Sequence, residues 1–244
     1  MSKPTIVLVH GAWADGSSWN AVASHFRDEG HTVFAPPNLL RGVGTDAAYI
    51  ASFLAQRTTG PVVLVGHSYG GFVITNAGAG AGGGDVRALV YVDAFVPDEG
   101  ETVFEILGGS GSALDVPDPT TVLDLAAYPG SPEGDLEAFL KPDTVHTSFA
   151  QDLSERDRWL IVASQRPITL SANTSPSAAA AWKSIPSWAV VGTEDLVIPP
   201  QTQQRMAERA GATITTVDGS HVSMVSHPQV TIDAITAAAD TVGD

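Results

Sequence analysis

Residues 62–71 constrain the fold of this chain more than any other segment. Four consecutive aliphatic residues at 62–65 lead directly into Gly-His-Ser-Tyr-Gly at 66–70, which matches the pattern Gly-x-Ser-x-Gly. After a strand, this pattern predicts a sharp turn into a helix, with the serine hydroxyl exposed above a sheet. The flanking glycines suit such a turn because they carry no β-carbon that could collide with the neighbouring backbone. Ser68 is therefore our candidate nucleophile.

The rest of the chain alternates short apolar runs with segments of helical periodicity. Apolar runs that are continuous rather than alternating are typical of a parallel sheet covered on both faces. The pattern therefore predicts an α/β fold with a mostly parallel sheet and helices on both sides. The expected strands are 5–9, 31–34, 62–65, 88–92, 187–191 and 212–217, and the expected helices are 17–29, 45–57, 69–80, 201–210 and 227–241, with a glycine-rich turn at 82–84.

This alternation stops after Pro97 and resumes near residue 181. The intervening residues 98–180 contain a Gly-Gly pair, several prolines and short amphipathic pieces, with no further strand–helix unit. A segment of ~80 residues is too long for a plain loop. We expect a helical cap insertion over the carboxyl ends of the strands, where open α/β sheets bind ligands. The predicted organisation is a core of residues 1–97 and 181–244, with residues 98–180 as the cap.

Composition excludes several classes of function. The chain has no cysteine, which rules out disulfides, thiolate metal sites and a cysteine nucleophile. Its 27 acidic and 12 basic residues give a net charge of −15, which disfavours binding to nucleic acids or anionic membranes. We found neither an apolar run of ~18 residues nor a signal-peptide pattern, so we expect a cytoplasmic protein that does not enter membranes. No clustered metal ligands are apparent, and we expect no metal.

A serine nucleophile needs a base, and the base needs a carboxylate that orients it. The expected strand 187–191 is followed by Glu194 and Asp195, and the strand 212–217 is followed by Asp218 and His221. This gives the chain order Ser…Asp…His that is typical of Gly-x-Ser-x-Gly hydrolases. His221 is the favoured base. Asp195 is the favoured acid, although Glu194 and Asp218 are also plausible from their positions in the loops.

Two backbone N–H groups are candidate donors to an oxyanion. The first belongs to Tyr69, the residue after the nucleophile, and the second is expected in the loop after the first strand. That loop reads His-Gly-Ala-Trp at 10–13, and a turn at Gly11 would direct the N–H of Ala12 inward. A simpler interpretation is a tight turn in which Trp13 covers the core. The two interpretations are compatible, because packing of Trp13 would also fix the loop.

These motifs together resemble the α/β-hydrolase superfamily. The chain is most similar to the small esterases related to plant methyl-salicylate and methyl-jasmonate esterases and to hydroxynitrile lyases, including bacterial members. The resemblance implies that Ser68, Asp195 and His221 form a triad with Ala12 and Tyr69 as oxyanion donors. It also implies that no cofactor is needed, and it makes a homodimer one option. The motifs lie at residues 8–13, 66–71, 91–97, 192–195 and 219–221.

The function that follows is hydrolysis of small carboxylic esters through an acyl-enzyme on Ser68. A hydroxynitrile lyase would use the same triad, but that branch places threonine and lysine where this chain has Gly11 and Val222. A perhydrolase or haloperoxidase-like activity also shares the triad. A non-catalytic ligand-binding protein is the remaining alternative, and the intact triad disfavours it.

The expected substrate pocket is apolar, because aromatic and aliphatic residues occur both near the site motifs and in the cap. An ester with an apolar or aromatic group would fit such a pocket. The residues expected to line it are Trp13, Phe95, Phe104, Leu125, Phe149 and Trp159.

Overall fold

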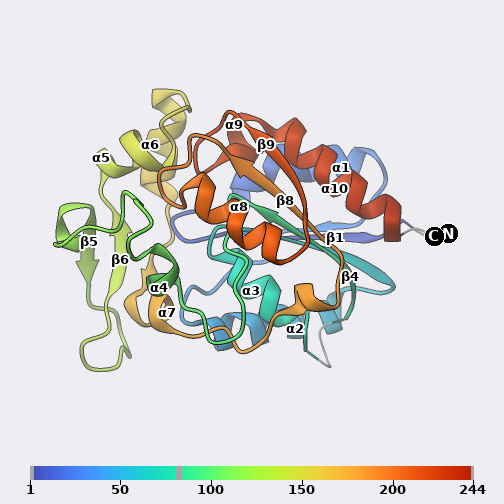
Figure 1. Cartoon of the computed structure of the whole chain (residues 1–244), viewed down its shortest axis with the longest axis horizontal. Coiled ribbons are helices and arrows are strands. Elements are labelled where there is room, and N and C mark those ends of the chain that lie inside the picture. Colours follow the sequence, from blue (N-terminus) through green and yellow to red (C-terminus); the bar gives the residue numbers. More distant parts are fainter. Residues whose placement is uncertain (1–2, 81–83, 243–244) are drawn as a thin grey trace.

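The computed structural model describes residues 3–80 and 84–242, so most of the expected turn at 82–84 lies outside the described residues. Within them, a six-stranded parallel sheet has the strand order β2-β1-β3-β4-β8-β9 (Figure 1). The α/β prediction with a mostly parallel sheet is therefore confirmed. The strands are β1 (Thr5–Val9), β2 (Val33–Phe34), β3 (Pro61–His67), β4 (Asp85–Val92), β8 (Ser187–Gly192) and β9 (Thr213–Val217).

Helices cover both faces of this sheet (Figure 1). Helices α1 (Asn20–Asp28) and α10 (Pro228–Val242) pack together on one face, and α2 (Val43–Arg57) and α3 (Gly70–Ala77) pack together on the other. Helix α8 (Pro200–Arg209) contacts β8 and β9. Short helical turns at η1 (Gly16–Trp19), η4 (Ala181–Lys183) and α9 (Ser223–Ser226) connect these elements.

Apolar periodicity explains why the layers hold together. Every residue of β1 is buried, as expected for a strand between two helical layers. In α2 the buried residues Val43, Ala47, Ile50 and Leu54 are spaced by three or four positions, so they share one face of the helix. Burying each such aliphatic side chain stabilises the fold by roughly 1.5–3 kcal/mol. The sheet is thus fixed between two packed helical layers, with its carboxyl edge beside the cap segment.

The segment 98–180, which we call the cap segment, is only partly helical. It contains a three-stranded antiparallel sheet of β5 (Leu123–Ala126), β6 (Glu137–Leu140) and β7 (Ile168–Thr169). The sequence analysis missed this sheet because strands of two to four residues are too short for a period-two pattern to stand out. The remaining elements are α4 (Val103–Leu107), η2 (Pro119–Thr121), α5 (Pro142–Thr144), η3 (Val145–Phe149), α6 (Glu155–Ser164) and α7 (Leu170–Thr174).

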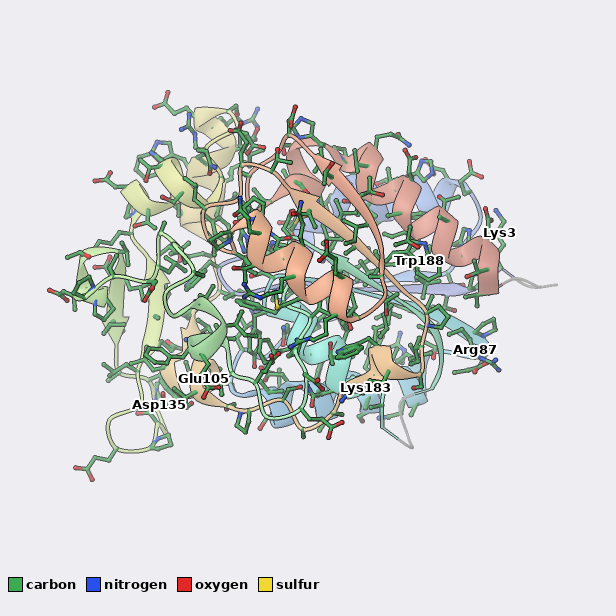
Figure 2. All side chains as sticks on the ribbon, viewed as in Figure 1. Lys3, Arg87, Glu105, Asp135, Lys183 and Trp188 are labelled. Carbon is green, nitrogen blue, oxygen red and sulfur yellow. The ribbon has the colours of Figure 1, made fainter. Side chains whose placement is uncertain are left out.

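Charged side chains occur at both ends of the molecule. Lys3 and Arg87 lie at the end of the molecule remote from the cap segment, whereas Glu105 and Asp135 belong to that segment (Figure 2). In the part of the chain that the structure describes, every helix is too short or too polar to cross a membrane.

Candidate active site

Ser68 lies at the turn between β3 and α3 in a left-handed backbone conformation, with a φ of 53°. This conformation is strained for a residue with a side chain, and it is typical of functional turns. The neighbouring chain leaves no room for larger residues beside it. A β-carbon at Gly66 would lie 2.7 Å from the carbonyl oxygen of Gly70, and one at Gly70 would lie 2.6 Å from that of Val9. The two glycines of the motif are therefore required by close packing.

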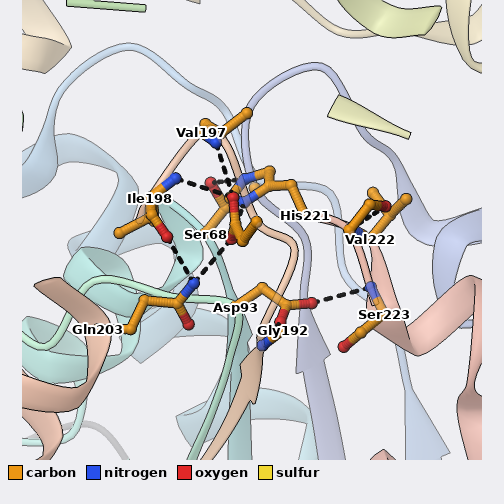
Figure 3. A network of polar contacts seen from close by, with 12 residues as sticks. Ser68, Asp93, Gly192, Val197, Ile198, Gln203, His221, Val222 and Ser223 are labelled. Atoms are coloured by element: carbon orange, nitrogen blue, oxygen red, sulfur yellow. Dashed lines mark hydrogen bonds and ion pairs between the residues drawn. The ribbon is translucent and has the colours of Figure 1, made fainter. Parts of the chain in front are cut away.

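The side chains of Ser68, His221 and Asp195 form a continuous hydrogen-bonded chain. His221 Nε2 lies 2.8 Å from Ser68 Oγ, and His221 Nδ1 lies 2.7 Å from Asp195 Oδ2 (Figure 3). All three residues are buried. They follow β3, β8 and β9, whose carboxyl ends meet at one edge of the parallel sheet. Because Nδ1–H donates to the carboxylate, Nε2 is left to accept the serine proton.

Asp195 accepts three further hydrogen bonds that fix its carboxylate. Oδ1 accepts from the backbone N–H groups of Val197 at 2.8 Å and Ile198 at 2.9 Å, and Oδ2 accepts from Gln203 Nε2 at 2.7 Å (Figure 3). Hydrogen bonds to an ionised group are stronger than neutral ones. Sequence reasoning missed Gln203, because a glutamine on an amphipathic helix usually faces solvent.

The other two candidate acids do not contact His221. Glu194 is exposed, and its backbone carbonyl accepts a hydrogen bond from Gln151 in the cap segment. Asp218 is also exposed, and its carboxylate accepts from Thr193 Oγ1 at 2.9 Å. Asp218 therefore braces the two loops against each other, while Asp195 is the carboxylate that meets the histidine.

A second buried histidine links the site to the first strand. His67 Nε2–H donates to the carbonyl oxygen of His221 at 2.8 Å, and its Nδ1 accepts from the N–H of Gly11 at 3.4 Å. Burial lowers the pKa of His67 well below its usual range. A neutral ring suits this pair of contacts, because one nitrogen must donate and the other must accept. His67 thus joins the backbone of the loop that carries Ala12 to the backbone of His221.

The N–H groups of Ala12 and Tyr69 donate no hydrogen bond to the described residues. The loop that carries Ala12 is held by two hydrogen bonds from Trp13. The backbone N–H of Trp13 donates to the carbonyl oxygen of Arg166, and its ring N–H donates to the carbonyl oxygen of Ala138, both at 2.9 Å. Both acceptors belong to the cap segment. The amide of Ala12 is thus free while its loop is anchored.

The Tyr69 side chain is also fixed. Its hydroxyl donates to the buried carboxylate of Asp46 at 2.8 Å, and that carboxylate also accepts from the backbone N–H of Arg41. Burial raises the pKa of both Tyr69 and Asp46. This contact holds the residue whose N–H is the other candidate oxyanion donor. Asp46 was not singled out from the sequence.

Asp93 is a second buried carboxylate at this edge of the sheet. Its Oδ1 accepts from the N–H of Gly192 and its Oδ2 accepts from the N–H of Ser223, both at 2.9 Å (Figure 3). It thereby joins the loop that precedes Asp195 to the segment that follows His221. Burial, and secondarily the negative charge of Asp195, raise the pKa of Asp93 to about 7.

This raised pKa predicts a pH-dependent stability. The folded protein holds the Asp93 proton more tightly than the unfolded chain, in which the carboxyl has its ordinary pKa of 3.8. The free energy of unfolding should therefore fall as pH rises from about 4 to about 7. Asp93→Asn should remove this contribution. Between pH 5 and pH 8 the free energy of unfolding should therefore fall by at least ~1 kcal/mol less in the variant than in the native protein. Urea unfolding at the two pH values measures the difference. Equal losses would show that Asp93 does not titrate in this way.

The predicted pocket residues fall into two groups. Trp13 and Phe149 line a cavity of about 530 Å³, with their rings edge to face and the centroids 6.2 Å apart. Phe95 packs against Phe72 in the core, and Leu125 is half-buried against the core from β5.

Phe104 and Trp159 are not placed in the cavity. Phe104 is 70% exposed on α4, and Trp159 is 48% exposed on α6, with its ring edge to face against His146. Neither residue lines this cavity, and the expectation that they line the substrate pocket stays a prediction. Short helices without a sustained apolar period give no indication of which face turns inward.

Comparison with known proteins shows the family of this chain. Residues 6–234 match the family model described as the alpha/beta hydrolase family, and the chain belongs to that family. It is 26% identical over 257 residues to Methylesterase 2 of Arabidopsis thaliana, covering 98% of this chain and 97% of that protein. The expected resemblance to the plant methylesterases is thereby confirmed.

Two further similarities agree with this assignment. The chain is 37% identical over 114 residues to the carbendazim hydrolyzing esterase of Nocardioides sp. (strain SG-4G), and this match spans 41% of the chain and 46% of that esterase. The crystal structure of polyneuridine aldehyde esterase has the same fold, with a TM-score of 0.81, 21% identity, and coverage of 97% and 99% of the two chains. The family match and the two curated relatives named as esterases support a hydrolase of the carboxylesterase type, and the crystal structure supports the fold.

Proposed function

We propose that this protein hydrolyses small carboxylic esters through an acyl-enzyme on Ser68. The observation that carries the proposal is the continuous contact from Ser68 Oγ through the His221 ring to the Asp195 carboxylate, at 2.8 and 2.7 Å. A nucleophile, a base and an orienting acid in this geometry are the groups that acyl transfer to a serine requires. The relatives named as esterases support the same reaction class.

The proposed reaction has two halves. In the first, His221 Nε2 takes the Ser68 proton as Oγ attacks the ester carbonyl, and the N–H groups of Ala12 and Tyr69 stabilise the oxyanion. The intermediate then collapses, and His221 returns its proton to the departing alcohol. In the second half a water molecule attacks the acyl-enzyme by the same route, which releases the acid and restores the serine.

The environment of Gly11 disfavours the hydroxynitrile lyase alternative. A β-carbon at this position would lie 2.6 Å from Ser68 Cβ and 2.8 Å from the carbonyl oxygen of His67. A threonine, which the lyase branch has there, would therefore displace the nucleophile. Val222, at the position of the lyase lysine, is buried and uncharged, so no cation is present there to hold cyanide.

An apolar or aromatic group on the ester is the second part of the proposal. The Phe149 ring lies against the triad, with its centroid 5.1 Å from that of His221, and the Trp13 ring packs against Phe149. Apolar walls with few polar groups favour neutral hydrocarbon groups over charged ones near the reacting carbon.

Rapid-mixing kinetics with p-nitrophenyl acetate tests the acyl-enzyme directly. We expect p-nitrophenolate release to be followed by slower deacylation, and acid quenching during turnover should trap one acetyl group per chain. Added hydroxylamine should accelerate turnover by attacking the same acyl-enzyme. Turnover without trapped acetyl and without a response to hydroxylamine would contradict the proposal. Cleavage of mandelonitrile faster than any ester would favour the lyase instead.

A further inference from the structure

We propose that strands β6 and β7 of the cap segment position both oxyanion donors, so that the cap segment contributes to catalysis as well as the core. The inference rests on the proposed esterase function and adds positioning residues to it. On the Ala12 side the positioning residue is Trp13. On the Tyr69 side the positioning residues are Arg41 and Asp46. Each acts through the backbone N–H of a donor residue rather than on the substrate.

Neighbouring residues of β6 and β7 hold two separate loops of the core. Glu137 pairs with Thr169 across the two strands, and Ala138 follows directly on β6. Ala138 contacts the loop at 10–13, whereas Glu137 and Thr169 contact the turn at 40–42. Because these strand residues are adjacent, the two core loops share one anchor.

On the Ala12 side, the cap segment holds the residue that follows the donor. The backbone N–H of Trp13 donates to the carbonyl oxygen of Arg166, two residues before β7, and its ring N–H donates to that of Ala138. Trp13 has a φ of 56°, which is strained for a residue with a side chain. Such strain persists only where surrounding contacts enforce it. The two hydrogen bonds to the cap segment are contacts of this kind.

On the Tyr69 side, the link begins at the turn formed by residues 40–42. The N–H of Thr169 donates to the carbonyl oxygen of Leu40 at 3.1 Å, and Arg41 forms an ion pair with Glu137 at 2.5 Å. Leu40 is buried and has a φ of 60°. Each core loop therefore contains a strained residue at the point where the cap segment binds its backbone.

The Asp46 carboxylate joins this turn to Tyr69. It accepts from the backbone N–H groups of Arg41 at 3.1 Å and Gly42 at 3.3 Å, and from the Tyr69 hydroxyl at 2.8 Å. The carboxylate is fully buried, so any movement away from these donors would leave buried polar groups unpaired. A continuous path of contacts therefore runs from β7 to the residue that follows Ser68.

Trp13→Phe and Tyr69→Phe each cut one link and leave the backbone N–H groups in the chain. We expect each variant to lower kcat by about 5- to 50-fold with little change in KM, because complete loss of an oxyanion donor costs ~10²–10³ and displacement costs less. Steady-state kinetics with p-nitrophenyl butyrate measures both parameters.

Two control variants remove the same chemical groups elsewhere. Trp182→Phe removes a ring N–H that donates to the carbonyl oxygen of Pro97 at 2.7 Å. Tyr91→Phe removes a buried hydroxyl that lies 2.9 Å from Thr75 Oγ1. Both controls should keep kcat close to the native value. Losses as large as those of Trp13→Phe and Tyr69→Phe would contradict the positioning role.

A pair of ketones separates the oxyanion site from the rest of the pocket. Ser68 Oγ adds to the carbonyl carbon of trifluoromethyl hexyl ketone, its proton passes to His221 Nε2, and the carbonyl oxygen becomes an oxyanion. Methyl hexyl ketone has nearly the same shape but adds far less readily. In Trp13→Phe and Tyr69→Phe, Ki for the trifluoromethyl ketone should rise by the factor by which kcat falls, and Ki for the methyl ketone should be unchanged. Equal increases for both ketones would show an altered pocket and overturn the inference.

Arg41→Met tests the attachment to the cap segment on the Tyr69 side. It removes the ion pair with Glu137 and keeps the backbone N–H that donates to Asp46. Ki for the trifluoromethyl ketone should rise by about 2- to 5-fold, because a half-exposed ion pair contributes no more than this. Lys141→Met is the control, since Lys141 pairs with Asp124 inside the cap segment, and it should leave this Ki unchanged. Equal Ki values for Arg41→Met and the native protein would show that β6 and β7 do not position Tyr69.

These measurements distinguish failure of the inference from failure of the proposed function. The native protein could cleave p-nitrophenyl acetate while Trp13→Phe and Tyr69→Phe leave kcat and both Ki values unchanged. That result would overturn positioning by the cap segment and leave the esterase proposal standing. A native protein that hydrolyses no ester would instead refute the proposed function.

Discussion

Replacing Ser68 with alanine should lower kcat for ester hydrolysis by about 10⁴-fold or more. In the described residues, Ser68 Oγ is the hydroxyl in contact with His221 Nε2, so no other side chain is placed to attack the ester carbonyl. Alanine keeps the β-carbon and removes only the oxygen. The variant should therefore fold normally, and its urea unfolding midpoint should stay close to that of the native protein. Steady-state kinetics with p-nitrophenyl butyrate measures the loss.

Ser223→Ala is a matched control for this variant. Ser223 is also buried at the same edge of the sheet, and its Oγ has no hydrogen-bond partner among the described residues. Its contact with Asp93 is made by the backbone N–H, which alanine retains. We expect less than a tenfold change in kcat. A loss below tenfold for Ser68→Ala, or similar losses in the two variants, would show that Ser68 is not the nucleophile.

The second large effect is expected for Asp195→Asn, which should lower kcat by up to ~10⁴-fold. An amide has one acceptor oxygen, whereas Oδ1 and Oδ2 of Asp195 both accept hydrogen bonds. If the amide nitrogen faces His221, the ring must place its proton on Nε2, where it can no longer accept from Ser68. If the amide nitrogen instead faces the N–H groups of Val197 and Ile198, hydrogen-bond donors oppose one another, and the loop is displaced.

The exposed acids of the same loops provide the comparison. Glu194→Gln and Asp218→Asn should each lower kcat by less than tenfold, because neither side chain contacts His221. Measuring kcat for all three variants at one pH, with unfolding curves to exclude misfolding, ranks the acids. If Asp218→Asn were the most damaging, the acid would have to be reassigned.

The sequence predicted those parts of the fold that depend on local pattern. Continuous apolar runs such as 62–65 indicated buried parallel strands, and the structure places β3 at Pro61–His67. The boundaries were less accurate. The helix expected at 45–57 begins at Val43, and the strand expected at 31–34 is reduced to Val33–Phe34. Element ends depend on caps and contacts that a periodic pattern does not contain.

Contacts between distant residues were not predictable in the same way. Asp93 accepts from a residue 99 positions away and from another 130 positions away, so nothing adjacent in the chain indicates its partners. An acidic residue directly after a buried strand was the available signal, and it was not used. The bridge from Trp13 to Ala138 similarly depends on how the cap segment folds back over the core.

The central claim is that Ser68 becomes covalently acylated, and active-site labelling tests it most directly. The protein should be treated with a fluorophosphonate, digested, and mapped by mass spectrometry, with residual esterase activity measured on the same samples. The account predicts one adduct per chain, located on Ser68, with activity lost in proportion to labelling and no adduct in Ser68→Ala. An adduct on a different residue, or full activity in a completely labelled sample, would contradict it.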